Sequence, residues 1–290
     1  MRAHYDGKRA GVFREGGGVR LEAVILGCGS SGGVPRVGGD WGICDPNELR
    51  NRRTRCSILV RYSEADSGPT TDVLVDTSPD LREQLLAAGV ERIDALVYTH
   101  DHADQCHGID DIRALAYRMR GQVPTYMDRD TLNELTSRFA YCFATPEGRA
   151  HPPILDAQPL IAAGGTFSVD GPGGALEIGV LGLSHGPTPS LGLLFAGRLA
   201  YSPDVHGVPE AALERLQGVD TWICDALRYH DHPTHAHADK TLSWQARTRA
   251  RHMVLTNLHI DMDYRTLANE LMASQVPAYD GMVVSAGTAD

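Results

Sequence analysis

Side chains that can bind a metal ion are concentrated in one short segment of the chain. His100, Asp101, His102 and Asp104 come shortly after the apolar run from Ala95 to Tyr98, which is typical of a short buried strand. His100, His102 and Asp104 stand at alternate positions, so an extended or tightly turned strand end would point all three to one side. Imidazole nitrogens and a carboxylate form a ligand set that suits zinc, manganese or iron. The spacing therefore predicts a divalent metal site.

Two residues farther along the chain could complete such a site. His185 follows a predicted strand over residues 176–183, and Asp204 follows another over residues 199–202. Taken alone, a His or Asp at a strand end commonly caps a turn. Taken with the spacing and order of the whole set, both residues are candidate ligands. A hydrolase with two metal ions needs them about 3.5 to 4 Å apart. The segments that contain His185 and Asp204 each offer one ligand for such a centre.

The segment from Thr99 to Gly108 closely resembles the His-x-His-x-Asp-His signature of the metallo-β-lactamase superfamily, with Gln105 in place of the last His. The block from Gly27 to Pro35, followed by residues 52–57, is similar to the phosphodiesterase branch of that superfamily. This branch includes tRNase Z and the phosphoribosyl 1,2-cyclic phosphate phosphodiesterases. The resemblance runs from about Leu21 to Val284. It implies an α/β fold, the αββα sandwich of two mixed β-sheets flanked by helices.

The resemblance also implies which residues bind the metals. One metal would be held by three histidines, a second by Asp104, and a carboxylate would bridge the two: His100, His102 and His185, with Asp204 as the bridge. In the cyclic phosphodiesterases a cluster of three cysteines holds a structural zinc. This chain keeps only Cys44 at that place, so we expect no structural zinc.

The second metal position departs from the family pattern. Gln105 and Asn257 stand where the family has histidines, and a neutral amide is a much poorer ligand than imidazole for these metals. His259, two residues after Asn257, could take over as a ligand, and His107 is a weaker candidate. The alternative is one tightly held metal with a second that is weak or absent. We therefore expect one or two divalent ions, with zinc or manganese favoured and iron open.

Histidines also gather between Tyr229 and Asp239, before a predicted helix. The resemblance aligns His237 with a histidine that contacts the substrate phosphate. A protonated His beside a phosphate could stabilise developing charge or protonate a leaving oxygen. His235 and His237 are therefore expected to bind the substrate and to act in catalysis, whereas the competing interpretation is a solvated loop.

Four further residues are assigned supporting roles. Ser31 lies in the glycine-rich block, and Arg53 belongs to a local cluster of arginines. Both are expected to bind the substrate. For Arg53 the reason is that guanidinium groups suit phosphate. Asp104 would act as the general base if only one metal binds. Asp76, at the end of a predicted strand, would hold a ligand histidine in orientation.

The hydrophobic pattern predicts a single domain over residues 21–290, preceded by a disordered lead-in over residues 1–20. Strands are expected over residues 21–26, 57–62, 73–75, 95–98, 176–183, 191–195, 199–202, 221–224 and 253–255, with one short strand near Phe167 in the otherwise loop-like tract 151–174. Helices are expected over residues 79–88, capped by Thr77 or Ser78, and over residues 110–120, 131–143, 209–216, 238–251 and 264–274.

Composition narrows the function classes. The chain has 290 residues and a formal net charge of -10, which argues against coating a nucleic-acid backbone and makes folded RNA a less favoured substrate than a small phosphate compound. Six cysteines without paired spacing fit reduced thiols. The sequence shows neither a membrane-spanning run nor a signal peptide, so we expect a cytoplasmic protein without a membrane partner. A homodimer stays open.

These observations favour a metal-dependent hydrolase that cleaves a phosphodiester by means of a metal-activated hydroxide. The expected substrate is a small cyclic phosphate or a nucleotide-like molecule. Two alternatives stay open. A mononuclear iron dioxygenase of the persulfide type could use His100, His185 and Asp204 as its ligands. A catalytically weak nucleotide- or phosphate-binding protein would explain Gln105 and Asn257.

Overall fold

The computed structural model describes residues 18–145, 147–148 and 150–287. The predicted lead-in over residues 1–20 lies almost entirely outside the described residues. Within them, no helix is both long enough and apolar enough to cross a membrane.

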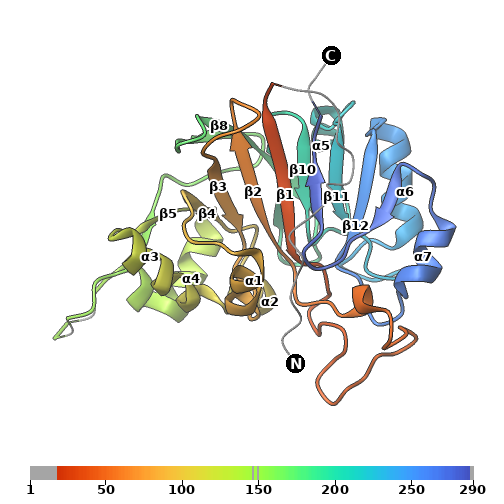
Figure 1. Cartoon of the computed structure of the whole chain (residues 1–290), viewed down its shortest axis with the longest axis horizontal. Coiled ribbons are helices and arrows are strands. Elements are labelled where there is room, and N and C mark those ends of the chain that lie inside the picture. Colours follow the sequence, from red (N-terminus) through yellow and green to blue (C-terminus); the bar gives the residue numbers. More distant parts are fainter. Residues whose placement is uncertain (1–17, 146, 149, 288–290) are drawn as a thin grey trace.

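Two seven-stranded β-sheets form the centre of the molecule (Figure 1). The first sheet has the order β14-β1-β2-β3-β4-β5-β6, and the second has the order β13-β12-β11-β10-β9-β8-β7. The strands of the first sheet are β1 (Arg20–Gly27), β2 (Ser57–Ser63), β3 (Thr71–Val75), β4 (Ala95–Val97), β5 (Val123–Tyr126), β6 (Leu155–Ala157) and β14 (Val283–Ser285). The strands of the second are β7 (Thr166–Val169), β8 (Leu176–Leu183), β9 (Ser190–Phe195), β10 (Leu199–Ser202), β11 (Thr221–Asp225), β12 (His252–Thr256) and β13 (Gln275–Pro277).

Both sheets are mixed. In the first sheet β14, β1, β2 and β3 pair antiparallel, while β3 to β6 run parallel. In the second sheet β7 to β10 pair antiparallel, while β10 to β13 run parallel. The predicted fold class, two mixed sheets flanked by helices, is confirmed.

Helices cover the outer face of each sheet (Figure 1). The first sheet is covered by α1 (Leu81–Ala88), α2 (Ala103–Cys106), α3 (Ile112–Met119) and α4 (Arg129–Phe143), with the 3-10 turn η2 (Ile109–Asp111) between α2 and α3. The second sheet is covered by α5 (Glu210–Arg215), α6 (Ala238–Thr248) and α7 (Tyr264–Glu270). A further 3-10 turn, η1 (Leu49–Asn51), lies in the long loop between β1 and β2.

Three hydrophobic cores hold these layers together, because successive side chains of a strand point to opposite faces. In β1, Ile25 packs into the core between the two sheets, whereas Val24 and Leu26 pack into the core beneath α1 and α3. The third core lies between the second sheet and its helices, where the rings of Trp222 and Trp244 stack 6.3 Å apart. This layering leaves the strand ends free to carry polar loops.

Several sequence-based element boundaries need correction. The helix expected from Pro79 begins at Leu81, and neither Thr77 nor Ser78 caps it. The Ser78 hydroxyl instead donates to Gln84 Oε1 at 2.9 Å. Of the two conformations expected for His100 to Asp104, extended or tightly turned, the extended one is wrong, because α2 begins directly after His102. Strands β5, β6, β13 and β14 were not predicted, since each has only three or four residues.

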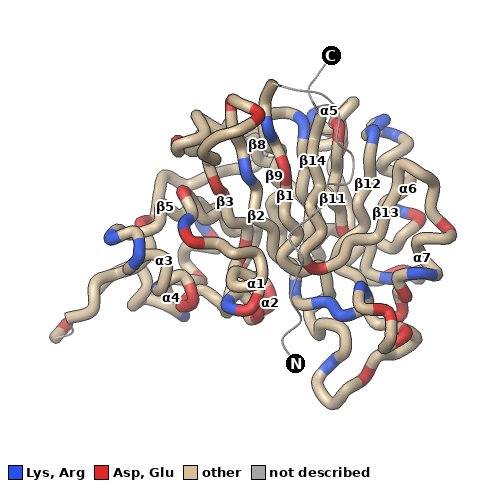
Figure 2. The backbone as a smooth tube through the Cα atoms, in the orientation of Figure 1, with Lys and Arg blue, Asp and Glu red and all other residues tan. Residues whose placement is uncertain are grey.

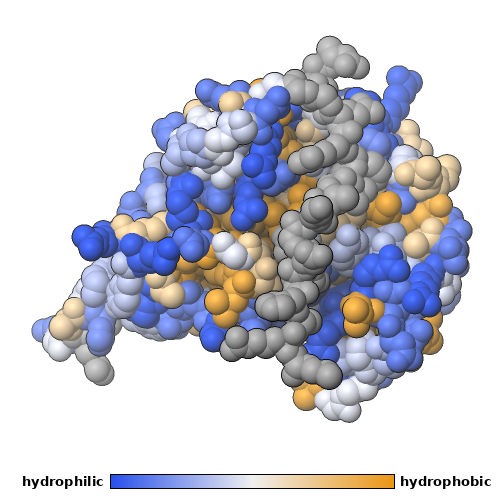
Figure 3. Space-filling view, viewed as in Figure 1, coloured by the Kyte–Doolittle hydropathy of each residue, from blue (hydrophilic) through white to orange (hydrophobic). Residues whose placement is uncertain are grey.

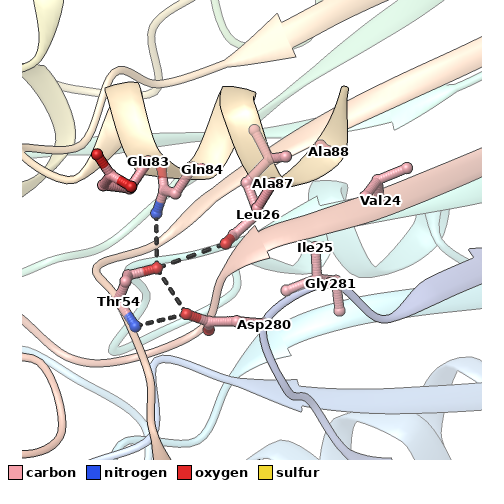
Figure 4. Close-up of a pocket in the computed structure, with 10 residues that line it drawn as sticks. All are labelled: Val24, Ile25, Leu26, Thr54, Glu83, Gln84, Ala87, Ala88, Asp280 and Gly281. Atoms are coloured by element: carbon pink, nitrogen blue, oxygen red, sulfur yellow. Dashed lines mark hydrogen bonds between the residues drawn. The ribbon is translucent and has the colours of Figure 1, made fainter. Parts of the chain in front are cut away.

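A half-buried carboxylate, Asp280, ties the start of the glycine-rich loop to the loop before β2, and Figure 4 shows its two hydrogen bonds with Thr54. Asp280 accepts hydrogen bonds from the backbone amide of Cys28 at 3.1 Å and from the amide and hydroxyl of Thr54, both at 2.7 Å. Burial raises the pKa of Asp280 to about 6. The Thr54 hydroxyl also accepts a hydrogen bond from Gln84 of α1 at 2.9 Å. Asp280 thereby joins the end of β1 to the loop after η1, and Thr54 connects that loop to α1.

The surface carries both signs of charge. Figure 2 shows Lys and Arg interspersed with Asp and Glu along the whole trace, although acidic residues outnumber basic ones, 37 to 27. In Figure 3 hydrophilic residues make up most of the outline of the visible face. The loop between β1 and β2 departs from this pattern, since Val37, Ile43 and Leu49 are among the most exposed large apolar residues described.

Candidate metal centre

Four predicted ligands meet at the ends of strands from both sheets. One possible ligand atom from each of His100, His102, His185 and Asp204 lies within 4.8 Å of every other. His100 follows β4, while His185 and Asp204 follow β8 and β10 of the second sheet. The structure therefore brings together the three histidines and the carboxylate assigned to the first metal.

Hydrogen bonds turn two of these histidines toward the centre. The Nδ1 atom of His185 lies 2.7 Å from the carbonyl oxygen of Thr234, so it carries the proton and leaves Nε2 free. The Thr99 hydroxyl donates to Asp76 Oδ2 at 2.8 Å and lies 3.0 Å from His100 Nδ1, from which it can accept. Such outer contacts orient metal-binding imidazoles in known sites. Asp76 thus lies one hydrogen bond away from the partner of His100, which suits its predicted role.

The electrostatics of the group fit a bound cation. The Nε2 atoms of His100 and His185 each lie 3.5 Å from Asp204 Oδ2, yet the buried His100 Nε2 has no hydrogen-bond partner among the described residues. Burial lowers the pKa of His185 to about 4, which keeps this imidazole neutral. Burial alone would raise the pKa of Asp204, but the neighbouring imidazoles lower it. Asp204 in turn raises the pKa of His100 against the effect of burial, so in the absence of a cation His100 carries part of the positive charge that a divalent metal would supply after displacing that proton.

The residues of the second metal position surround the other oxygen of Asp204. The amide nitrogens of Gln105 and Asn257 lie 3.5 Å and 3.3 Å from Asp204 Oδ1. Asp104, in the first turn of α2, accepts from the Gln105 amide at 3.4 Å. Burial and the nearby Asp204 raise the pKa of Asp104, as expected for two neighbouring carboxylates.

A histidine and a carboxylate form a buried pair beside the four-residue group. His235 Nδ1 lies 2.8 Å from Asp225 Oδ2 at the end of β11, and the His235 ring lies 4.6 Å from the ring of His185. Burial alone would lower the pKa of His235, but the hydrogen bond and charge of Asp225 raise it to about 9. His235 therefore carries a proton at neutral pH, next to the candidate metal ligands.

Three other predicted histidines lie elsewhere. His237 precedes α6, and its Nδ1 lies 2.9 Å from the exposed carboxylate of Asp231. His259 contacts the Arg36 guanidinium through Nε2, and its Nδ1 lies 2.9 Å from Asp261. Neither belongs to the group of possible metal ligands found among the described residues, so the structure does not favour His259 as a ligand. His107 is exposed and packs edge-on against Phe139 at 5.7 Å, so it cannot serve as a substitute ligand either.

The two residues expected to contact substrate from the N-terminal block differ in accessibility. Ser31 is exposed in the tight turn of the glycine-rich loop. Arg53 is only 2% exposed, and its guanidinium donates to the carbonyl oxygens of Met262 and His259 at 2.7 Å and 3.3 Å. The substrate-binding role expected for Arg53 therefore needs correction, because the side chain is committed to holding the loop after β12.

Three residues that contact predicted site residues were not singled out from the sequence. Thr99 and Asp225 orient His100 and His235, and Arg36 contacts His259. Asp225 had a detectable signal, since it ends an apolar run as Asp76 does, and β11 lies in parallel between β10 and β12. Arg36 had none, because the path of a glycine-rich loop does not follow from its composition.

Comparison with known proteins identifies the family. Residues 71–260 match the family model described as a beta-lactamase superfamily domain. The chain belongs to this superfamily. A solved structure described as a new diphosphatase from the PhnP family is 32% identical, with a TM-score of 0.80 over 92% of this chain and 98% of that one. The short form of human tRNase Z shares the fold at 17% identity, with a TM-score of 0.62 over 91% of this chain and 99% of that one. The chain is a metallo-hydrolase related to the PhnP family.

A curated relative is much longer than the segment it shares with this chain. An octanoyltransferase of Porphyromonas gingivalis is 29% identical over 218 residues, which are 74% of this chain and 41% of that protein. The chain therefore spans about two fifths of the length of that relative. The transferase named there is a property of the longer protein.

Proposed function

We propose that this metallo-hydrolase cleaves a phosphodiester in a small cyclic phosphate or nucleotide-like substrate. The observation that carries the proposal is the contact of His235 Nδ1 with Asp225 Oδ2 at 2.8 Å, with the His235 ring 4.6 Å from the ring of His185 in the candidate metal group. Hydrolysis of a phosphodiester needs stabilisation of negative charge and a proton for the leaving oxygen. The centre offers a metal site for the first need and His235 for the second.

The roles follow from these positions. A divalent metal held by His100, His102, His185 and Asp204 would supply a Lewis acid and activate water. His235 donates its proton to the departing oxygen, and Asp225 stabilises the charge on His235 before the transfer. His237 lies on the same segment, and we retain it as a phosphate contact rather than the proton donor, because its partner Asp231 is exposed to solvent.

The ligand types bear on the identity of the metal. Three imidazoles and one carboxylate suit zinc and manganese, and iron can also occupy such a set. We propose zinc or manganese as the native metal. A homodimer and a cytoplasmic location remain predictions from the sequence.

The relative described as a diphosphatase defines the substrates to compare. We would remove the metal with a chelator, restore zinc or manganese, and measure hydrolysis of bis-p-nitrophenyl phosphate, a cyclic nucleotide and a dinucleoside diphosphate. The expected result is metal-dependent cleavage of the diester and of at least one natural type of substrate. His100→Ala and His185→Ala should lose both bound metal and turnover. Bound iron with oxygen uptake on a persulfide and no phosphate release would overturn the proposal in favour of a dioxygenase.

A further inference from the structure

We propose that this centre is built for a single metal ion, because amide groups occupy the side of Asp204 on which a second ion would bind. The inference concerns the number of metals. It holds whether or not the substrate proposed above is correct.

The two oxygens of Asp204 face different kinds of partner. Oδ2 faces His100 Nε2 and His185 Nε2, each at 3.5 Å, and these nitrogens can bind a metal. Oδ1 faces the amide nitrogens of Gln105 and Asn257 at 3.5 Å and 3.3 Å. A carboxylate that bridges two metals through both of its oxygens would offer Oδ1 to the second ion. Here two N–H donors point their partial positive charge at that oxygen, and they would repel a cation.

The amide of Asn257 cannot turn its oxygen toward the centre without a penalty. Its Nδ2 lies 3.3 Å from Asp204 Oδ1 and 3.2 Å from Asp225 Oδ1, and an ionised carboxylate only accepts hydrogen bonds. A flipped amide would place its oxygen against both carboxylate oxygens, and the contact with His235 Nδ1 at 3.1 Å would offset only part of that cost. The backbone also fixes this residue, since Asn257 has a φ of 61° and the next amide donates to the carbonyl of Cys28 at 2.8 Å.

Gln105 is placed in a similar way between two carboxylates. Its side chain is fully buried, and its Nε2 lies 3.4 Å from Asp104 Oδ2 and 3.5 Å from Asp204 Oδ1. The donor orientation gives each carboxylate a long hydrogen bond and leaves the buried Oε1 without a partner among the described residues, whereas the reverse orientation would set oxygen against two carboxylate oxygens. Gln105 therefore acts as a neutral link between Asp104 and Asp204 in the place of a second cation.

No other side chains of the described residues supply a second site. Among the described His, Cys, Asp and Glu side chains, the four-residue group is the one set of three or more whose ligand atoms meet within 4.8 Å. Asp104 and His235 lie nearby but stand outside that set. His259, the sequence-based substitute, is engaged by Arg36.

Metal counting on the full chain tests the inference without any substrate. Protein stripped with a chelator would be titrated with zinc chloride or manganese chloride by calorimetry, and bound metal would be counted by elemental analysis after gel filtration. We expect one equivalent for the native chain. We expect two for the double variant Gln105→His with Asn257→His, which replaces both amides with imidazole ligands.

A matched double variant, Gln105→Ala with Asn257→Ala, removes the amides without adding ligands and should stay at one equivalent. Two equivalents in the native chain would overturn the proposal. A folded histidine variant that still binds one equivalent would overturn the role given to the amides. Circular dichroism reports whether each variant folds. If a variant fails to fold, the count for the native chain still decides the number of metals. Absence of hydrolysis would bear on the proposed function and leave this count unaffected.

Discussion

Thr99 fixes the direction of a metal-binding nitrogen although it is not itself a candidate ligand. Its hydroxyl donates to Asp76 and can accept from His100 Nδ1, which leaves His100 Nε2 free. Thr99→Val keeps the shape and removes this link. We expect metal affinity to fall about 10- to 100-fold, as for other outer contacts of metal ligands, measured by competition with a chelating dye. Thr125→Val is the control, because Thr125 is buried in β5 and its hydroxyl donates to the carbonyl of Val123 in the same strand at 2.9 Å. Equal affinity in both variants would contradict the role of Thr99.

Asp225 sets the pH above which His235 can no longer donate a proton in the proposed reaction. Since Asp225 raises the pKa of His235 to about 9, protonated His235 is present below that pH and lost above it. In Asp225→Asn the raising interaction disappears while burial still lowers the pKa. We therefore expect the falling limb of the pH profile of kcat/KM to move toward lower pH, with a loss of about tenfold or more at pH 8.

Two controls separate proton donation from a structural effect of this substitution. Asp231→Asn alters the exposed carboxylate beside His237 and should leave the limb in place. In Asp225→Asn, the rate of hydrolysis should fall more for diphenyl phosphate than for bis-p-nitrophenyl phosphate, because a poor leaving group depends more on protonation. An equal loss on both substrates would argue against His235 as the acid.

Site residues were predictable where chemistry and position coincide. His100, His102, His185 and Asp204 follow strands of recognisable apolar pattern, and the structure brings them together. The choice between His235 and His237 could not be made from the sequence, because it depends on which of them reaches Asp225 across a loop. The substrate-binding role predicted for Arg53 was wrong for a related reason. Local composition does not indicate that its guanidinium is buried against backbone carbonyl groups.

At the scale of elements, the centre depends on several strands that end in one place. Strands β4, β8, β10, β11 and β12 each lead directly into a residue of the centre. The longer strands were predictable because they are nearly all apolar. Three of the four marginal strands were not, since β6, β13 and β14 have three residues each and are specified by their neighbours in space; the fourth, β7, is the short strand expected near Phe167. Short margins of this kind carry too few residues to show a period.

Gly108 determines how the metal-binding loop packs on the chain before α1. A Cβ atom at this position would lie 2.0 Å from the carbonyl oxygen of Ser78, and backbone cannot move aside easily. We expect Gly108→Ala to lower the free energy of unfolding by about 1–3 kcal/mol, the usual range for overpacking, and to weaken metal binding by shifting α2. Urea unfolding and metal titration measure the two effects. Gly121→Ala is the matched control, because a Cβ atom there meets nothing within 4 Å; similar losses in both variants would refute the packing argument.

At the scale of the whole molecule, the long loop between β1 and β2 joins the two halves of the sandwich. It starts in the first sheet, and Asn51 and Arg53 bind residues that follow β12 of the second sheet. The loop contains Glu48, which accepts from Arg50 at 2.8 Å and from Arg265 of α7 at 2.6 Å. The position of this loop beneath α7 can be followed in Figure 1. No sequence pattern predicted this connection, because it rests on contacts between residues about 200 positions apart, such as Glu48 with Arg265.

These ion pairs make part of the stability dependent on pH. Hydrogen bonds from Arg50 lower the pKa of Glu48 to about 2, below the value of an unfolded chain. A depressed carboxyl pKa contributes stability above the unfolded value, and that contribution disappears as pH falls toward the folded value. Glu48→Gln should therefore be less stable than the native chain at pH 7, by about 1 kcal/mol given the exposure of both arginines. The difference should shrink as pH approaches 2.

Urea unfolding at pH 7, 4 and 3 measures this difference in stability. Glu83→Gln is the control, because Glu83 belongs to an exposed pair with Arg82. A difference that stays constant down to pH 3 would assign the loss to packing of the side chain and not to its charge.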